Sequence, residues 1–248
     1  MENYINNFNN YDKSIIYDFI IGDGGIGDFV KFFMIMLTDC MKNNMKIYHK
    51  KNNLPIESYI KFKYEFMSIT PEEISKLDNH VIKKPNDYYN NDKYKDGIPL
   101  KEVFYFDDSV KLNVQNVIPF LPKKYISIHL RLGDKYLETD ENFIVVKHDT
   151  RSYSEEKLYH FIEEHSNDNI IFFCDNNSFK LKVKNHYNNI FITETEIGHT
   201  SLKNTTQKQT LDAVTDFYLL SESEFIYAAS FSGFSKMAAD FNKIEIIY

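Results

Sequence analysis

The chain has few of the features that mark a secreted, membrane-embedded or disulfide-rich protein. It has only two cysteines, Cys40 and Cys174, each within an apolar-periodic segment, so we expect buried thiols rather than a disulfide or a metal site. Its first residues show no positively charged region followed by an apolar one, and no apolar run approaches the length of a membrane span. We therefore expect a soluble, cytoplasmic protein without a membrane span.

Basic residues are also too few and too scattered for a general nucleic-acid surface. The chain has 29 lysines and arginines against 36 acidic residues, a formal net charge of −7, and no long basic run. We expect no nucleic-acid partner, because such surfaces depend on clustered positive charge. Any phosphate site must then be local. The length of 248 residues is enough for one large domain or two small ones.

The first half begins with a strand, a glycine turn and a helix. The apolar run at 14–21 predicts a buried strand, the spacing over 28–41 predicts a helix, and a second strand follows at 46–48. Residues 1–13 are polar and predict a loose lead-in. Between 52 and 116 the patterns are weaker, with short helices at 55–60 and 70–77, a surface loop at 86–97 and a strand at 102–106. Asp107 and Asp108 come directly after that strand, where we expect a solvated turn or a cap on the next helix rather than metal ligands.

The second half alternates strands and helices regularly, which is typical of a parallel doubly wound sheet. A helix is expected from Ser152, which with Glu155 has capping-box spacing. The prolines at 119 and 122 favour a boundary between domains at 1–118 and 119–248. The elements predicted after that boundary are strands at 125–129, 169–174, 189–193, 224–228 and 244–247 and helices at 152–165, 178–187, 206–221 and 235–241.

Four of the chain's eight glycines lie in one turn, at Gly22, Gly24, Gly25 and Gly27. They satisfy the G-x-G-x-x-G pattern that brings a helix N-terminus against a dinucleotide. That pattern also needs an acidic residue after the second strand, where this chain has the basic run 49–51. A basic end suits a 2′-phosphate, so an NADP-dependent Rossmann oxidoreductase that uses Gly22 to Gly27 stays open. A turn that binds no ligand also stays open.

The most informative stretch is the strand at 125–129 and the charged loop after it. His129, Arg131, Asp134 and Glu138 lie within ten positions. Ligands of open α/β sheets bind outside the carboxyl ends of the strands, so Arg131 is expected to face an anion. The simpler alternative is that Arg131 and Asp134 pair across a solvated turn.

His129-x-Arg131-x-Gly133-Asp134 resembles the H-x-R-x-G-D signature of the α1,2-, α1,6- and protein O-fucosyltransferase group, whose members have the GT-B architecture. Gly24-Gly25-Ile26-Gly27 matches that group's G-G-x-G turn. Two later segments are similar to it in the same order, 171–176, which contains Asp175, and 216–235. The resemblance implies an α/β, GT-B-like fold with two Rossmann-like doubly wound domains that face each other across a cleft.

For activity, the resemblance implies metal-independent, inverting transfer of fucose from GDP-fucose to a glycan or protein hydroxyl, without a cofactor. The chain also lacks the D-x-D triplet on which the metal-using GT-A glycosyltransferases typically rely. The N-terminal domain would be the acceptor side. A catalytically degenerate module that only binds a nucleotide sugar is a further possibility of another class.

The same resemblance implies roles for individual residues. Arg131 would clamp the diphosphate, since a guanidinium donates two parallel hydrogen bonds. Glu138, one position short of the usual spacing, would be the catalytic base, and Asp134 is the alternative base or a brace for the loop. Asp216 is expected to fix a helix, and His199 lies on a loop expected to reach the cleft. The other expected substrate-binding residues are Gly24, Gly25, Gly27, His129, Asp175, Ser232, Gly233, Phe234 and Ser235.

Overall fold

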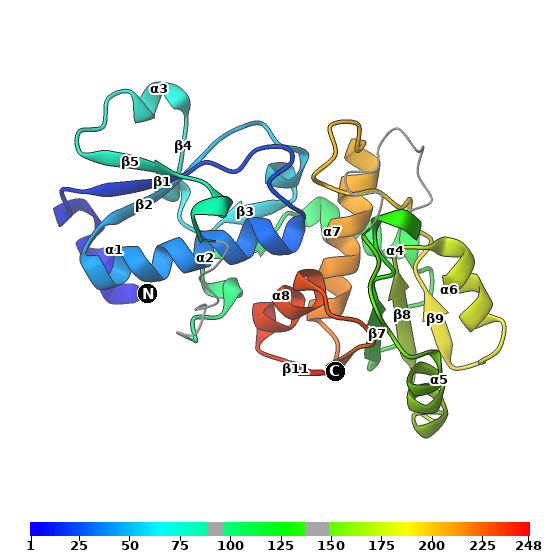
Figure 1. Cartoon of the computed structure of the whole chain (residues 1–248). Coiled ribbons are helices and arrows are strands. Elements are labelled where there is room, and N and C mark those ends of the chain that lie inside the picture. The colour runs from blue at the N-terminus through cyan, green and yellow to red at the C-terminus, as the bar shows by residue number, and fades with distance from the viewer. Residues whose placement is uncertain (89–96, 137–148) are drawn as a thin grey trace.

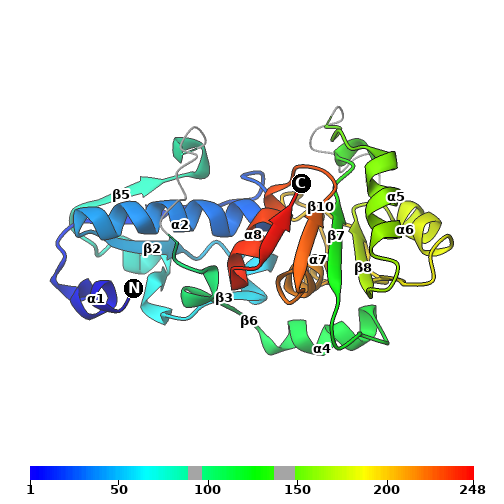
Figure 2. The same cartoon turned by 90° about the horizontal axis from the view of Figure 1, so that it is seen from below.

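The computed structural model describes residues 1–88, 97–136 and 149–248, and it is a mixed α/β protein built on parallel sheets (Figures 1 and 2). The first sheet lies on one side, the second sheet lies on the other, and α7 (Gln207–Ser221) and α8 (Gly233–Asn242) lie between the two sheets. The helix α4 (Asp108–Val117) comes from the first half of the chain but packs on α7, on the side of the second sheet. The expected α/β class is therefore confirmed.

The first sheet has four parallel strands in the order β4-β2-β1-β5. Its central connection is α2, which follows the glycine turn as predicted and is buried on nearly all sides. A helix that is apolar all round must pack against protein on more than one side, and α2 lies between the first sheet and the second half of the chain. The bounds here are β1 Ser14–Tyr17, α2 Ile26–Asn43, β2 Lys46–Lys50, β4 Ser68–Ile69, α3 Pro71–Ile74 and β5 His80–Lys83.

The expected loose lead-in at 1–13 is wrong in part. Residues Glu2–Asn7 form α1, and a 3-10 turn follows at Phe8–Asn10. Tyr4 of α1 and Phe8 of the 3-10 turn contact each other, with ring centroids 5.7 Å apart, and both pack into the core. Tyr4 Oη also donates to Met45 O at 2.8 Å. Two apolar anchors thus fix a segment that is polar in composition.

A small antiparallel pair, β3 (Ile60–Phe62) and β6 (Phe104–Phe106), adjoins the first sheet. The helix predicted at 55–60 is only a 3-10 turn at Pro55–Ser58 before β3. Asp107 caps α4 (Asp108–Val117), because its carboxylate accepts from Ser109 N at 3.0 Å, which confirms the expected cap. The remaining 3-10 turns of this half are Glu65–Met67, Pro85–Tyr88 and Leu100–Glu102.

The second sheet has five parallel strands in the order β11-β10-β7-β8-β9. Chain order runs outward from β7 in both directions, as in a doubly wound sheet, and the direction reverses between β7 and β10. Ligands of such sheets bind at this reversal. The bounds are β7 Ile126–Leu130, 3-10 turn Asp134–Tyr136, α5 Glu155–Glu164, β8 Ile170–Cys174, α6 Asn177–Lys184, β9 Ile190–Ile192, β10 Phe225–Ala228 and β11 Glu245–Ile247.

Helices cover both faces of this second sheet because its strands are apolar on both sides. In β8, Phe172 belongs to the cluster beneath α5, which includes Leu158, whereas Phe173 on the opposite face joins the cluster that includes Phe217 of α7. The expected cap of α5 was misplaced. Ser154, not Ser152, is the cap, because its hydroxyl accepts from Lys157 N at 3.2 Å.

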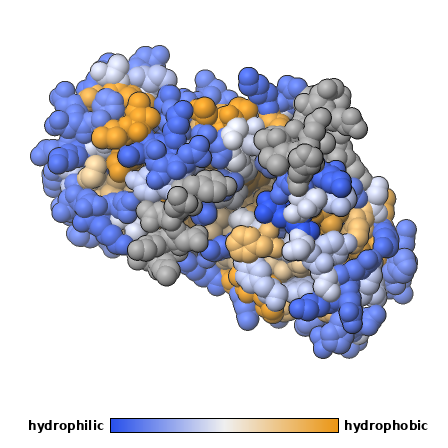
Figure 3. Space-filling model, in the orientation of Figure 1, coloured by the Kyte–Doolittle hydropathy of each residue, from blue (hydrophilic) through white to orange (hydrophobic). Residues whose placement is uncertain are grey.

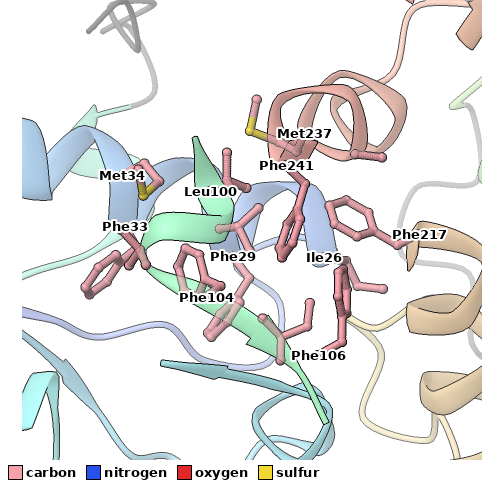
Figure 4. Packing of buried hydrophobic residues seen from close by; sticks show 14 of the residues in the cluster. Ile26, Phe29, Phe33, Met34, Leu100, Phe104, Phe106, Phe217, Met237 and Phe241 are labelled. Atoms are coloured by element: carbon pink, nitrogen blue, oxygen red, sulfur yellow. The ribbon is translucent and has the colours of Figure 1, made fainter. Parts of the chain in front are cut away.

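One continuous core joins the two halves beneath α7 and α8 (Figure 4). The ring of Phe106 lies 4.5 Å from that of Phe241 and 6.1 Å from that of Phe217, measured between centroids. The segment with the two prolines links α4 to β7. The division into domains at 118 and 119 stays a prediction.

The face of the molecule in Figure 3 is mostly hydrophilic, with a hydrophobic patch where β5 lies in Figure 1. Val81 and Ile82 of this edge strand are about half exposed. None of the described helices is both long enough and apolar enough to cross a membrane.

Candidate functional site

A cleft of about 650 Å³ lies at the reversal between β7 and β10. Its walls come from both halves of the chain: the glycine turn before α2, the loop after β7, the loop after β9 and the start of α8. The volume is within the range of about 300–1,000 Å³ usual for small-molecule sites. Of the predicted site residues, it is lined by Gly24, Gly25, Gly27, His129, Arg131, Asp134, Asp175, Ser232, Gly233 and Phe234.

Arg131 follows β7 and points its guanidinium at carboxylates of the cleft. Its Nη1 lies 2.7 Å from Asp175 Oδ2, its Nη2 contacts Asp134, and Asp149 Oδ2 lies 4.0 Å away. The Arg131–Asp134 pair foreseen as the simple alternative is therefore present, but it lies in the cleft. A guanidinium has five N–H donors in a planar fork, so two close carboxylates do not occupy all of them.

Asp175 holds the loop after β7 in place. Its Oδ1 accepts from Leu132 N at 2.8 Å, and its Oδ2 accepts from Gly133 N at 3.0 Å. Gly133 has a φ of +110°, and a Cβ there would lie 2.3 Å from Asp149 O, so this turn needs glycine. Asp175 thus positions Arg131 with three hydrogen bonds, and the expected nucleotide contact stays a prediction.

The loop after β10 is tied to the loop after β7. Ser230 Oγ donates to Arg131 O at 2.9 Å and accepts from Arg131 N at 2.8 Å. Two residues later, Ser232 caps α8 by accepting from Phe234 N at 3.2 Å. Because β7 and β10 are paired neighbours, the start of α8 and Arg131 share one end of the cleft.

Ser235 does not fit its predicted role as a phosphate contact. It is fully buried, its hydroxyl donates to Ser232 O at 3.3 Å, and it is absent from the described lining of the cleft. The reason is helical geometry: position 235 lies in the first turn of α8 and faces inward, toward its own helix cap. Glu138, the expected base, lies outside the described residues.

The glycine turn meets the start of α8 directly. A Cβ on Gly27 would lie 2.7 Å from the backbone C and O of Gly233. Gly24 has a φ of +133°, and Gly25 N donates to Asp28 Oδ2 at 3.2 Å, which fixes the start of α2. The N-termini of α2 and α8, from different halves of the chain, thus lie side by side at the cleft, where their free N–H groups favour an anion.

His129 ends β7 beneath the cleft. Its ring stacks on Phe234 with centroids 5.4 Å apart, and its Nδ1 has no hydrogen-bond partner in the part of the chain that the structure describes. Burial lowers the pKa of His129 to about 3, and the positive charge of Arg131 adds to this effect. The ring is therefore neutral at physiological pH, and its unpartnered Nδ1 is buried.

The floor of the cleft has a second polar group, Asp216, which was expected from the sequence only to fix a helix. Asp216 of α7 lines it, with Oδ2 3.5 Å from Thr195 Oγ1, and Asp216 Oδ1 has no hydrogen-bond partner among the described atoms. Burial raises the pKa of Asp216 to about 6, although the charge of nearby Lys180 opposes the shift. Lys180 is buried and donates to Thr193 O at 2.9 Å and to Thr195 Oγ1 at 3.0 Å.

Three further cations reach the cleft, and none was named from the sequence. Lys31 of α2 and Lys236 of α8 line it without an ion pair to any described residue, and Arg151 contacts Asp149 at 3.2 Å. Their sequence positions gave no signal, since lone cations on helix surfaces are common. No group of three or more His, Cys, Asp or Glu side chains placed to hold a metal occurs among residues 1–88, 97–136 and 149–248.

Two of the three basic residues at 49–51, on which the NADP alternative depends, are already paired with carboxylates. His49 is buried, with Nε2 2.9 Å from Glu57 Oε1, and Lys50 Nζ lies 3.1 Å from Asp18 Oδ1. Side chains already paired with carboxylates are poor partners for a 2′-phosphate.

Comparison with solved structures shows similarity to fucosyltransferases. NodZ α1,6-fucosyltransferase co-crystallized with GDP has a TM-score of 0.56 with this chain at 8% sequence identity, over 92% of this chain and 91% of that one. A structure of NodZ α1,6-fucosyltransferase soaked with GDP-fucose gives 0.54 at 8% identity, over 93% and 92%. Fucosyltransferase NodZ from Bradyrhizobium gives 0.54 at 8% identity, over 92% of both chains.

Neither the protein-family models nor the curated proteins contain a match. The chain therefore has a fucosyltransferase-like fold at a sequence identity that shows the fold alone.

Proposed function

We propose that this protein is a metal-independent, inverting glycosyltransferase that transfers fucose from GDP-fucose to a hydroxyl of a glycan or protein. The proposal includes the GT-B arrangement, with residues 1–118 as the acceptor side and 119–248 as the side that binds the donor. Its support is the fold shared with fucosyltransferases and the geometry of the cleft.

The observation that carries the proposal is the meeting of three expected phosphate contacts. Arg131 and Ser232 follow two paired strands, and Gly27 touches Gly233 at the start of α8. A diphosphate between them would receive N–H donors from two helix starts and from one guanidinium. About a hundred residues of sequence separate each of these groups from the next, so their meeting at one cleft supports the proposal.

The nucleoside end of the donor would lie toward Asp216. A carboxylate can accept two hydrogen bonds from a guanine edge or from ribose hydroxyls, a role first expected for Asp175. Asp175 already receives three hydrogen bonds, two from the loop after β7 and one from Arg131, whereas Asp216 has an unpartnered oxygen. We therefore assign the nucleoside contact to Asp216 and His129, both of which line the cleft.

The chemistry then needs preorganised charge rather than a covalent intermediate. The bond from the sugar C1 to a phosphate oxygen breaks, its electron pair leaves with the diphosphate, and C1 forms a bond to the acceptor oxygen. Arg131 and the N–H groups at Ser232 and Gly233 stabilise the departing charge. The acceptor proton passes to a carboxylate, Glu138 by resemblance. Asp134 is engaged by Arg131, which suits a brace for the loop.

Titration of the protein with GDP, UDP and NADP by calorimetry tests the proposal. We expect selective binding of GDP, and Arg131→Ala should weaken it by roughly 30-fold or more, since removal of one partner of a desolvated charge pair costs about 2–5 kcal/mol. Arg131→Lys keeps the charge but loses the fork, so it should restore only part of the affinity. Lys124→Ala, at an exposed ion pair with Glu224, is the control for charge alone.

Turnover is measured as GDP released from GDP-fucose, with water as the acceptor. Selective binding of NADP, or GDP binding that is unchanged in Arg131→Ala, would contradict the proposal. Binding of GDP without any release from GDP-fucose would favour the degenerate binding module.

A further inference from the structure

The loop between β9 and α7 carries a histidine into the cleft and is held rigidly. Gln209 Nε2 donates to Ile197 O at 2.9 Å, and Asp212, which is fully buried, accepts from Glu196 N at 2.9 Å. Thr205 Oγ1 donates to His199 O, and Leu202 N donates to the same oxygen at 2.9 Å. A loop fixed at so many points presents its side chains with little freedom, as catalytic groups require.

The hydrogen bonds of His199 define its tautomer. Ser201 N lies 3.3 Å from His199 Nδ1, and Ser201 Oγ lies 2.6 Å from the same atom. A backbone N–H can only donate, so Nδ1 is an acceptor, and we assign the ring proton to Nε2. Burial lowers the pKa of His199, with a further contribution from the charge of Arg131, so the imidazole is neutral near pH 7.

The Nε2–H group of His199 points to a gap in the cleft. The nearest carboxylate oxygen, Asp134 Oδ1, is 3.9 Å from Nε2, which is too long for a hydrogen bond. None of the described residues accepts a hydrogen bond from Nε2. Across the gap lies the glycine turn, where a Cβ on Gly25 would be 3.9 Å from His199 Cε1. The gap therefore adjoins both Arg131's partner and the start of α2.

We propose that His199 is a further catalytic residue, whose Nε2–H donates a hydrogen bond to the phosphate oxygen that leaves the sugar. This inference rests on the proposed function. A donor fixed in advance strengthens its bond as the oxygen gains charge, so it stabilises the transition state more than the bound donor substrate. His199 keeps its own proton throughout, because the acceptor proton passes to the carboxylate base. Ser201 is a positioning residue that holds the required tautomer.

A neutral donor suits this place better than another cation would. Asp134, Asp149 and Asp175 surround Arg131, and a second fixed charge would pair with them permanently. The imidazole N–H of His199 donates to no carboxylate among the described residues, so it can donate its hydrogen bond to the ligand.

The test compares His199→Ala and His199→Gln with wild type, using GDP release from GDP-fucose and calorimetric GDP binding. We expect His199→Ala to lower the rate at saturating donor by about 100-fold, the usual effect of one lost preorganised donor, with less than about tenfold change in GDP affinity. Glutamine retains an N–H donor and should recover part of the rate. His160→Ala is the matched control, because His160 is exposed on α5 and 69% of its side-chain surface is accessible.

Nitrogen-15 spectra of histidine-labelled wild type add a readout that a purely structural role would not move. The Nε2–H signal of His199 should shift when GDP is added, whereas that of His160 should not. A rate for His199→Ala within about twofold of wild type, or an unmoved Nε2 signal at saturating GDP, overturns the inference. If wild type binds GDP and Arg131→Ala does not, such a result refutes only the role of His199. If wild type binds no GDP, both proposals fall.

Discussion

Replacement of Gly27 with alanine should force apart the two helices that meet below the cleft. The new Cβ would lie 2.7 Å from the C and O atoms of Gly233 and 3.0 Å from Phe234 N. These are backbone atoms, so no side-chain rotation can relieve the collision. Overpacking of this kind costs about 1–3 kcal/mol, and each kcal/mol should lower the melting temperature of a chain of this length by about 2–4 °C.

Gly233→Ala is a control that should leave stability intact but weaken GDP binding. Nothing lies within 4 Å of a Cβ at position 233, yet this residue lines the cleft. Alanine is the better helix former by up to about 1 kcal/mol, so stability should be unchanged or slightly higher. The added methyl group would occupy space beside the proposed phosphate contacts, so GDP affinity should fall.

Urea unfolding followed by circular dichroism gives the free energies, and calorimetry gives the GDP affinities. The expected pair of results is a destabilised Gly27→Ala and a stable Gly233→Ala that binds GDP weakly. Equal free energies of unfolding for Gly27→Ala and wild type would refute the direct contact between α2 and α8.

Two further variants probe the floor and the rim of the cleft. Because burial raises the pKa of Asp216 from 3.8 to about 6, the folded state holds this proton more tightly, and stability is lost as pH rises from about 4 to about 6. At 1.36 kcal/mol per pKa unit, the free energy of unfolding of wild type, measured with urea, should fall by up to about 3 kcal/mol relative to that of Asp216→Asn across that window. If the difference between the two free energies does not change with pH, Asp216 is not buried as described. Gly133→Ala combines a φ of +110° with a Cβ 2.3 Å from Asp149 O, so we expect a loss of at least about 1–3 kcal/mol and weaker GDP binding. Gly22→Ala, with a φ of +100° and open space, is its control for strain alone, and equal losses in the two would rule out the collision.

Much of the fold could be predicted from the sequence because buried parallel strands appear as continuous apolar runs. The strands at 125–129 and 224–228 were placed within a residue or two of β7 and β10. The pairing of β3 with β6 could not be predicted, because the two short strands are some forty residues apart and no local pattern identifies the partner of either. The helix α1 was missed because only Tyr4 and Phe8 carry its packing within a polar segment.

For the site, the sequence predicted which residues lie at the strand ends but not their hydrogen-bond partners. It placed Arg131 and Ser232 at the correct edge of the sheet, because parallel strands end together. It could not show that the loop after β7 occupies the carboxylate of Asp175 while Asp216 Oδ1 has no partner among the described atoms, since that depends on which N–H groups the folded chain brings near. The same limit applies to Ser235, whose inward direction follows from where α8 begins.

The packing of α8 on α2 has a consequence for co-translational folding. On the ribosome, residues 26–43 emerge long before residues 233–242, and one side of the earlier helix has no cover until the later one arrives. The side of α2 that packs on α8 must then stay exposed to solvent while residues 44–232 are synthesised. Its burial needs the complete polypeptide rather than the first half alone.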